Sequence, residues 1–502
     1  MRVLLQKHVE PAVTRNSARP GAQTSPLWTL GSTRTPQRTR QREAPTPSRA
    51  ERAVFVLLLT IIGAAAVPIG SIDPWWSGIF EAVIFLLGAC ALIATIGKSW
   101  ELPLVLAPFA ALVLVACLQV IPLYVKAFPA SYQILSLNPF ETGRFAIRLG
   151  AVGLTLALLL QFTKTRSQLL KLAQFVIFVG VASAVLAIWR RMLPDSTLAS
   201  LWNSKDGDFG QFTNRNHFTL LMEMCLGPTL SLAFYSRGPR RFLYFDIALL
   251  LILALILVNS RGGVISMIAQ LAFMSWIYFG ATFASSLMEQ TSTKSGRESR
   301  AQQFWRIAQG VTLRSLLILL LLGAVSAGVV WLGGESVRER LESVPGELVS
   351  RSGPLENVNP RRLEIWTATW KLFKAHPFLG SGFGAYKTAV SLYLNKGGNW
   401  EPQQAHNEYL ELSAGGGIVG AAIGVWFITI LIRQSRKRLR DRNPLRKVIC
   451  QGALVGLVGV AIHSLVDFGL HIMINTLICC CLITLATADV SFYPAESSTP
   501  AQ

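Results

Sequence analysis

Apolar stretches of roughly 20 residues recur along this chain and are separated by short polar connections. Such a stretch, folded as a helix, crosses the hydrocarbon core of a bilayer. A spanning barrel would instead need alternating strands of about 10 residues, and no such pattern occurs. The pattern therefore predicts an all-α, polytopic membrane protein with about twelve transmembrane helices, near 52–70, 78–96, 102–120, 144–163, 171–189, 216–235, 242–258, 262–283, 313–332, 405–432, 446–466 and 470–488.

The polar segments outside these spans define the remaining organisation. Residues 1–51 are rich in Arg, Ser, Thr and Pro, and we expect a disordered basic tail without a cleavable signal peptide. Residues 333–404 form the one long connection, and 491–502 form a short C-terminal tail. Long loops in compact architectures are usually functional or disordered.

The long loop contains a second type of pattern. The sequence RRLEIWTATWKLFKAHPFLGSGFGAY predicts an amphipathic helix, followed by a proline stop and a glycine-rich turn. Leu363, Trp366, Trp370 and Phe373 form an apolar stripe that we expect to pack on the outer surface of the bundle. A structured cap without chemistry is the alternative interpretation.

Composition and charge agree with a membrane protein and give its orientation. Of 502 residues, 51% are hydrophobic and 15% are charged, which is more apolar than an ordinary soluble domain. The basic run RQSRKRLRDRNPLRK at 433–447 marks a cytoplasmic connection, so both termini are expected in the cytoplasm and the 333–404 loop outside. The net charge of +20 therefore reports topology and contact with anionic lipid. Because the basic residues are scattered over separate connections, no nucleic-acid partner is expected.

The seven cysteines all lie in or beside apolar spans. No CxxC pair accompanies a matching histidine pair, so neither a disulfide framework nor a metal site is expected.

Polar residues that could take part in binding or catalysis gather on the side predicted to be outside. Arg215 and His217 lie at the mouth of one span, Arg261 lies in a tight turn, and Arg361 and Arg362 begin the loop helix. Ionisable residues at membrane level are costly and indicate function by default. Taken singly, Arg215 and Arg261 could equally be anchors that extend to the membrane surface.

The segment AHNEYLEL introduces the tenth predicted span. His406 could be an ordinary polar residue at a helix start, and Glu408 and Glu411 suit a first turn, where the helix dipole favours negative charge. The same dipole favours a neutral histidine, which could act as a general base.

Together these residue types indicate one kind of chemistry. Arginine binds phosphate oxygens in pairs and stays charged, so several arginines on one face predict a diphosphate cradle. A neutral histidine beside it fits transfer from a lipid diphosphate to a hydroxyl group. The leaving diphosphate supplies the driving force, and neither a P-loop nor a GxGxxG turn is present, so no cofactor is expected.

The segments NRNHFTLLMEM, SRGG, HPFLGSGFGAY, AHNEYLEL with GGGIVG, and HSLVDFGLHIMINTL resemble the O-antigen ligase and polymerase family over roughly 210–480. The resemblance implies a twelve-helix fold in the cell inner membrane, with a large periplasmic loop between the ninth and tenth spans. It also implies metal-independent, inverting transfer of an undecaprenyl-diphosphate-linked glycan. The catalytic base would be His406, and the diphosphate would be bound by Arg215, Arg261 and either Arg361 or Arg362, of which Arg362 fits the RxxxW pattern better. The basic tail 1–51 is not part of the family pattern.

The segment HSLVDFGLH places His463, Asp467 and His471 near the last outside turn. A polar cluster that satisfies itself between helices is one interpretation, and a part in acceptor or sugar binding is the other. Asp467, His471, Glu408 and His217 are therefore secondary candidates.

Several functions remain open at this stage. A ligase would move a finished glycan onto lipid A core or a similar acceptor, whereas a polymerase would join repeat units, and both need the same site. A protein O-oligosaccharyltransferase and a transporter are further alternatives, although the sequence shows no clear internal repeat of the transporter type.

Overall fold

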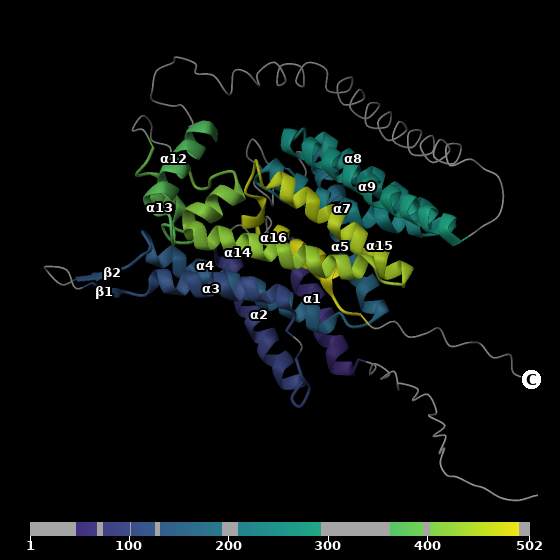
Figure 1. The fold of residues 1–502 in the computed structure, drawn as a ribbon, viewed down its shortest axis with the longest axis horizontal. Coiled ribbons are helices and arrows are strands. Elements are labelled where there is room, and N and C mark those ends of the chain that lie inside the picture. The colour runs from purple at the N-terminus through teal and green to yellow at the C-terminus, as the bar shows by residue number, and fades with distance from the viewer. Residues whose placement is uncertain are drawn as a thin grey trace, which may run out of the picture. The chain divides into compact units, whose positions relative to one another are not determined.

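The computed structural model describes residues 47–67, 74–100, 102–125, 131–192, 209–292, 362–394 and 402–490. All belong to one compact unit, Pro45–Gln502. The described residues are almost entirely helical, which confirms the all-α fold class (Figure 1). The helices are α1 (Arg49–Ala64), α2 (Pro74–Ala94), α3 (Ala107–Val120), α4 (Pro139–Phe162), α5 (Arg166–Met192), α7 (Arg215–Tyr235), α8 (Pro239–Leu257), α9 (Arg261–Ser292), α12 (Arg362–Ala375), α13 (Tyr386–Val390), α14 (Glu408–Leu439), α15 (Pro444–His463) and α16 (Met473–Thr487).

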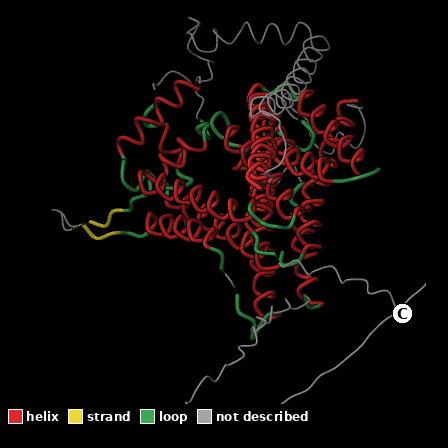
Figure 2. Tube along the Cα trace, turned by 45° about the vertical axis from the view of Figure 1, so that its right-hand side comes forward, coloured by secondary structure: helices red, strands yellow, loops and turns green. Residues whose placement is uncertain are grey.

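Short elements complete the described chain. The 3-10 turns are η2 (Leu104–Leu106) and η3 (Gly469–His471). Strands β1 (Leu123–Val125) and β2 (Ser131–Gln133) pair antiparallel, with Tyr124 opposite Tyr132, and join α3 to α4 as a hairpin (Figure 2).

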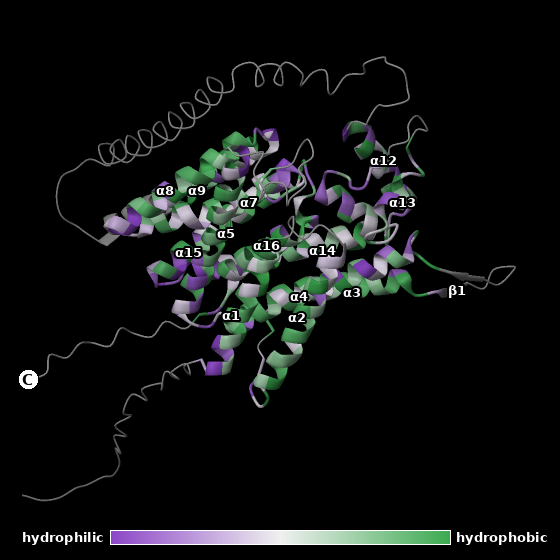
Figure 3. Cartoon of the chain, turned by 180° about the vertical axis from the view of Figure 1, so that it is seen from behind, coloured by the Kyte–Doolittle hydropathy of each residue, from purple (hydrophilic) through white to green (hydrophobic). Residues whose placement is uncertain are grey.

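Membrane spans follow from helix length and composition. Among the described residues, six helices are long and apolar enough to cross a membrane, and two shorter apolar helices are Leu104–Val120 and Met473–Thr487. Figure 3 shows mostly hydrophobic residues along α2. The chain is therefore a multi-pass membrane protein. Every predicted span in the described ranges overlaps a helix, whereas 313–332 lies outside them, so the count of twelve stays a prediction.

Asparagine side chains fix where several helices begin. Asn138, Asn214, Asn407 and Asn443 each accept backbone N–H bonds from the first turn of the helix that follows, which satisfies donors that have no partner within the helix. Ser48 and Glu51 form a capping box on α1, so this helix starts inside the predicted tail 1–51. Residues 1–46 lie outside the described ranges.

Helix α7 lies at the centre of the bundle. It packs against α15, α8, α5 and α9, and 89% of the residues in its most apolar stretch are buried inside the protein. Because neighbouring helices cover it on nearly all sides, polar side chains along α7 must find partners inside the protein.

Helix α14 is broken near its start, and the glycine-rich turn fills the break. Gly417 has φ +61°, in the region that side chains disfavour, and its missing Cβ would lie 2.3 Å from the Phe378 carbonyl oxygen. Ile418 N donates to Pro377 O, and Val419 N donates to Phe378 O, so the turn satisfies the freed backbone groups. This contact ties the loop after α12 firmly to α14.

The loop helix α12 does not pack through the apolar stripe predicted from its sequence. Helix α12 buries Ile365, Ala368, Thr369 and Leu372 against its neighbours, whereas Leu363 and Trp370 are 56% and 51% exposed. The hydrophobic pattern did not predict this buried face, because it includes the small Ala368 and the polar Thr369. Thr369 can be buried because its hydroxyl forms a hydrogen bond with that of Tyr386 at 2.6 Å.

Candidate functional site

The segment before α14 is held against the connection between α15 and α16. Asn407 caps α14 and also donates from Nδ2 to Leu465 O at 3.0 Å. Glu408 N donates to Ser464 O, also at 3.0 Å. Immediately before these anchors, His406 adopts φ 50°, a left-handed conformation that is uncommon for a residue with a side chain. Such conformations persist where the surroundings fix them, and they cluster at functional sites.

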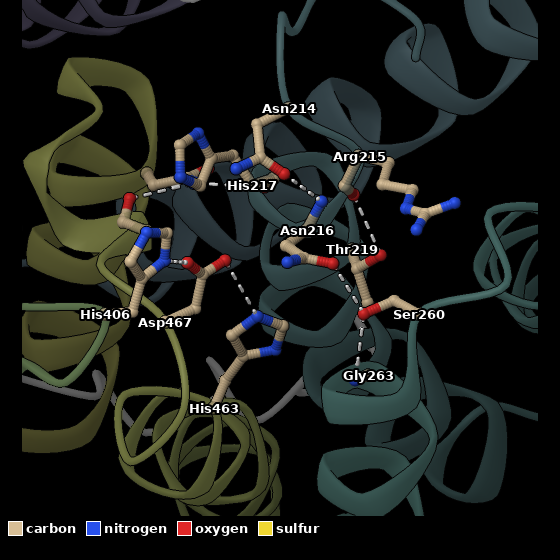
Figure 4. Close-up of polar contacts among 12 residues, drawn as sticks. Asn214, Arg215, Asn216, His217, Thr219, Ser260, Gly263, His406, His463 and Asp467 are labelled. Atoms are coloured by element: carbon tan, nitrogen blue, oxygen red, sulfur yellow. Dashed lines mark hydrogen bonds and ion pairs between the residues drawn. The ribbon is translucent and has the colours of Figure 1, made fainter. Parts of the chain in front are cut away.

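Four side chains from three parts of the chain form a continuous polar row. His406 Nδ1 lies 3.3 Å from Asp467 Oδ1, and Asp467 Oδ2 lies 3.7 Å from His463 Nε2 (Figure 4). His463 Nδ1 lies 3.0 Å from Glu223 Oε1 on α7. The His406 side chain is 26% exposed, whereas the other three are at most 1% exposed, so only His406 can meet a substrate.

The carboxylate of Asp467 determines the tautomer of His406. Burial by itself would raise the pKa of Asp467, but its interactions with His406 and His463 outweigh burial and hold the pKa below its ordinary value. An ionised carboxylate only accepts hydrogen bonds, so His406 must carry its proton on Nδ1. The lone pair of His406 Nε2 then remains to accept a proton from a hydroxyl group.

Three imidazole rings surround Phe468. The ring centroids of His217, His406 and His471 lie 4.8, 4.7 and 6.1 Å from that of Phe468, all edge to face. His217 is 3% exposed, and neither of its ring nitrogens has a hydrogen-bond partner among the described residues. A buried imidazole of this kind is normally satisfied by water or a ligand.

A second ionic group lies on the α14 side. His471 Nε2 is 3.3 Å from Glu408 Oε2 and 3.4 Å from Glu411 Oε1. Burial would lower the pKa of His471, but the neighbouring carboxylates of Glu411 and Glu408 raise it to about 9. His471 is therefore a cation at neutral pH, and the two glutamates hold the turn η3 as well as beginning their own helix.

The arginines of the predicted cradle begin neighbouring helices. Arg215 is the first residue of α7, and Arg261 is the first residue of α9. Ser260 Oγ donates to Asn216 Oδ1 at 2.9 Å, so the two helix starts are joined directly. In Figure 4 the Arg215 side chain points away from His406, so the structure brings the helix starts together without bringing this guanidinium to the histidine.

The glycines of SRGG explain how α9 approaches this group. A Cβ at Gly263 would lie 2.1 Å from Thr219 Cγ2, and one at Gly262 would lie 3.0 Å from Val466 Cγ2. Both glycines therefore allow a close approach of α9 to α7 and to the His463 region. The motif, weak by itself in the sequence, has a packing role beside the polar row.

The loop helix also reaches the histidine segment. Trp366 Nε1 donates to Ala405 O at 3.0 Å, next to His406. Arg362 is exposed and lies one helical turn before Trp366, on the same side of α12. Arg361 lies outside the described residues, so the choice between the two arginines stays a prediction.

Sequence reasoning overlooked Glu223 and gave His463 no individual role. Glu223 stands inside the predicted apolar span 216–235, where an acidic residue is costly and indicates a buried partner. The partner, His463, is 240 positions away. In the described ranges, no cluster of His, Cys, Asp and Glu side chains is placed to hold a metal ion.

The fold and this site define a polytopic, helical membrane protein with a cluster of ionisable side chains near one end of several helices. Residues 247–425 match the family model described as O-antigen ligase, which confirms the resemblance over this stretch. The match supports a ligase- or polymerase-type function. It includes Arg261, Arg362 and His406, whereas Glu223 and Asp467 lie outside it. No match was found among curated proteins.

Proposed function

We propose that this protein is an O-antigen ligase-like glycosyltransferase. It moves a glycan from an undecaprenyl-diphosphate carrier onto a hydroxyl of lipid A core or a similar acceptor. The observation that carries the proposal is the contact between His406 Nδ1 and Asp467 Oδ1, because it leaves the Nε2 lone pair on the one reachable side chain of the polar row. A polymerase that joins repeat units would use the same chemistry and is the second candidate.

In the proposed reaction His406 Nε2 takes the proton of the acceptor hydroxyl. The acceptor oxygen attacks the anomeric carbon of the glycan, and the bond from that carbon to the diphosphate oxygen breaks. The diphosphate leaves with the bonding electron pair, and a single displacement inverts the anomeric configuration. Asp467 stabilises the imidazolium that forms, as carboxylates do beside basic histidines.

The leaving diphosphate needs positive charge and N–H donors. Arg215 and Arg261 start two joined helices, where the helix dipoles also favour an anion. We propose that these arginines, with Arg362 from the loop helix, bind the diphosphate. We also propose that His217, whose ring nitrogens have no hydrogen-bond partner within the described part of the chain, adds a further contact to the donor.

The basic run at 433–447 supports a proposal for the membrane placement. We propose that both termini are cytoplasmic in the cell inner membrane, so that His406 and the 333–404 loop face the periplasm. No metal and no cofactor takes part in the proposed reaction.

The test is a gel profile of surface glycans from a deletion strain, complemented with wild type or with His406→Ala at equal membrane levels. The proposal expects wild type to restore the glycan and the variant not to restore it. His376→Ala is a matched control, because it removes another histidine, at the end of α12.

The banding pattern separates the candidate functions. Full ladders that remain on the lipid carrier in the variant indicate a ligase, and single repeat units indicate a polymerase. Normal glycan in the His406→Ala strain would refute a transferase that uses this histidine as its base.

A further inference from the structure

Two of the four side chains in the polar row cannot touch a substrate. Glu223 on α7 and His463 on α15 are 0% and 1% exposed, and their contact of 3.0 Å lies between two helices. A buried ionisable pair is costly to place in a membrane protein, and replacing it by apolar residues often costs nothing in stability. Holding α7 to α15 therefore does not by itself require this pair.

We propose that Glu223 and His463 are positioning residues that act on His406 through Asp467. The inference rests on the proposed function, in which His406 is the base. Glu223 orients His463, His463 orients Asp467, and Asp467 holds the proton of His406 on Nδ1.

The His463 ring lies between two carboxylates. Its Nδ1 faces Glu223 Oε1, and its Nε2 faces Asp467 Oδ2 at 3.7 Å. Both nitrogens thus point at carboxylate oxygens, which only accept when ionised. Among the described residues, Glu223 supplies the one hydrogen bond to this ring, so loss of that acceptor would leave the ring orientation to packing and to the longer approach of Asp467.

The orientation of Asp467 depends in turn on its two histidine neighbours. The side chain is 1% exposed, and its two oxygens face His406 Nδ1 at 3.3 Å and His463 Nε2 at 3.7 Å, the second distance being too long for a hydrogen bond. His463 therefore acts on Oδ2 through charge rather than through a hydrogen bond. Without that neighbouring ring in place, an ionised carboxylate would be less stable in a dry site, and it would either rotate or take up a proton. In both cases His406 would lose its fixed acceptor at Nδ1.

The surroundings hold the row from the outside. Gln270 on α9 donates from Nε2 to the backbone carbonyl oxygens of Glu223 and Val455, at 2.9 and 3.1 Å, and so links α7 to α15 through α9. A Cβ at Gly263 would lie 3.4 Å from Glu223 Oε1, so α9 also closes the space beside this carboxylate. Backbone position is thus fixed independently of the Glu223 side chain, and the side chain is left for orientation.

The test reads the tautomer of His406 directly, by ¹⁵N NMR of histidine-labelled full-length protein in lipid nanodiscs. Six histidines give a tractable spectrum, and His406→Gln assigns the signals of interest. Glu223→Met removes the acceptor and keeps the side-chain volume. Glu223→Gln keeps an oxygen that can accept from His463. Thr229→Val is the control, since Thr229 is also fully buried on α7 but bonds only within its own helix.

The proposal expects wild type, Glu223→Gln and Thr229→Val to show His406 protonated on Nδ1 alone. Glu223→Met should show a mixture of both tautomers, although residue 223 does not touch His406. In the transfer assay, kcat of Glu223→Met should fall on the order of 10- to 100-fold, as for partners of functional histidines elsewhere, with an unchanged KM for the donor. Unchanged His406 signals in Glu223→Met would overturn the proposal. If Glu223→Met does not accumulate, Glu223→Asp, which shortens the side chain, should give a smaller admixture of the second tautomer.

The two proposals fail in different ways. If His406→Ala keeps full transfer activity, the proposed function is wrong, whatever the spectrum shows. If His406→Ala is inactive but neither Glu223→Met nor Glu223→Asp alters the His406 signals, only the positioning role of Glu223 and His463 is wrong.

Discussion

His406 Nδ1 contacts Asp467 Oδ1 at 3.3 Å, across 61 positions of the chain. The contact joins the residue before the cap of α14 to the connection that follows α15. It exists because Asn407 and Glu408 bond to the carbonyl oxygens of Leu465 and Ser464 and so set the two segments side by side. The pairing makes one nitrogen of His406 a donor and leaves the other as an acceptor.

Asp467→Asn should therefore lower kcat by a factor on the order of 10² or more. The amide can donate to Nδ1 and so favour the tautomer that has its proton on Nε2. The measurement is single-turnover glycan transfer in reconstituted membranes. Asp489→Asn, which removes a carboxylate that pairs with Arg438 instead, is the matched control. Equal activity of Asp467→Asn and wild type would show that the tautomer of His406 does not matter.

The ion pairs of His471 should make stability depend on pH. The pKa of His471 in the folded protein is about 9, above its ordinary value of 6.5, because of Glu411 and Glu408. A raised pKa means that the folded state binds the proton more tightly. The stabilisation is therefore complete below about pH 6.5 and is lost as the pH rises through 9.

The corresponding measurement is a thermal melt of detergent-solubilised protein at pH 6.5, 8 and 9.5. Wild type should lose melting temperature over this range relative to His471→Gln, which cannot titrate. Parallel curves for the two proteins would contradict the assigned ion pairs.

Arg215→Lys and Arg261→Lys should each weaken binding of the donor. An ammonium group is a point charge and does not replace the planar fork that binds two phosphate oxygens. Losing one bond to a charged group corresponds to roughly a tenfold rise in KM for the donor. Arg433→Lys, in the basic run at the other end of α14, serves as the control. Unaltered KM in both site variants would remove these arginines from the donor site.

Gly263→Ala should separate α9 from α7. The added methyl would lie 2.1 Å from Thr219 Cγ2, and overpacking of this kind typically costs about 1–3 kcal/mol. We expect a lower melting temperature together with lower activity. Gly143→Ala on α4 meets nothing within 4 Å and should leave both unchanged. A normal melting temperature for Gly263→Ala would mean that the close approach of the two helices is not required.

The hydrophobic pattern by itself determined the fold class. Runs of about 20 apolar residues leave a helix as the only solution in lipid, so the predicted spans in the described ranges overlap helices without any tertiary information. The sequence also singled out His406, Asp467 and His471, because ionisable residues at helix ends beside a membrane are costly unless used. The resemblance of several segments to motifs of the O-antigen ligase and polymerase family indicated the type of reaction.

Only the tertiary structure decided which of these residues work together. Side-chain periodicity reports one helix at a time, so it could not show that Glu223 on α7 meets His463 on α15, or that Asp467 meets His406. It also chose the wrong face of α12, because burial of Thr369 depends on Tyr386, a partner from the next helix. Contacts between distant segments depend on how the helices pack and where Gly262 and Gly263 let them approach, and that information is spread over the whole bundle.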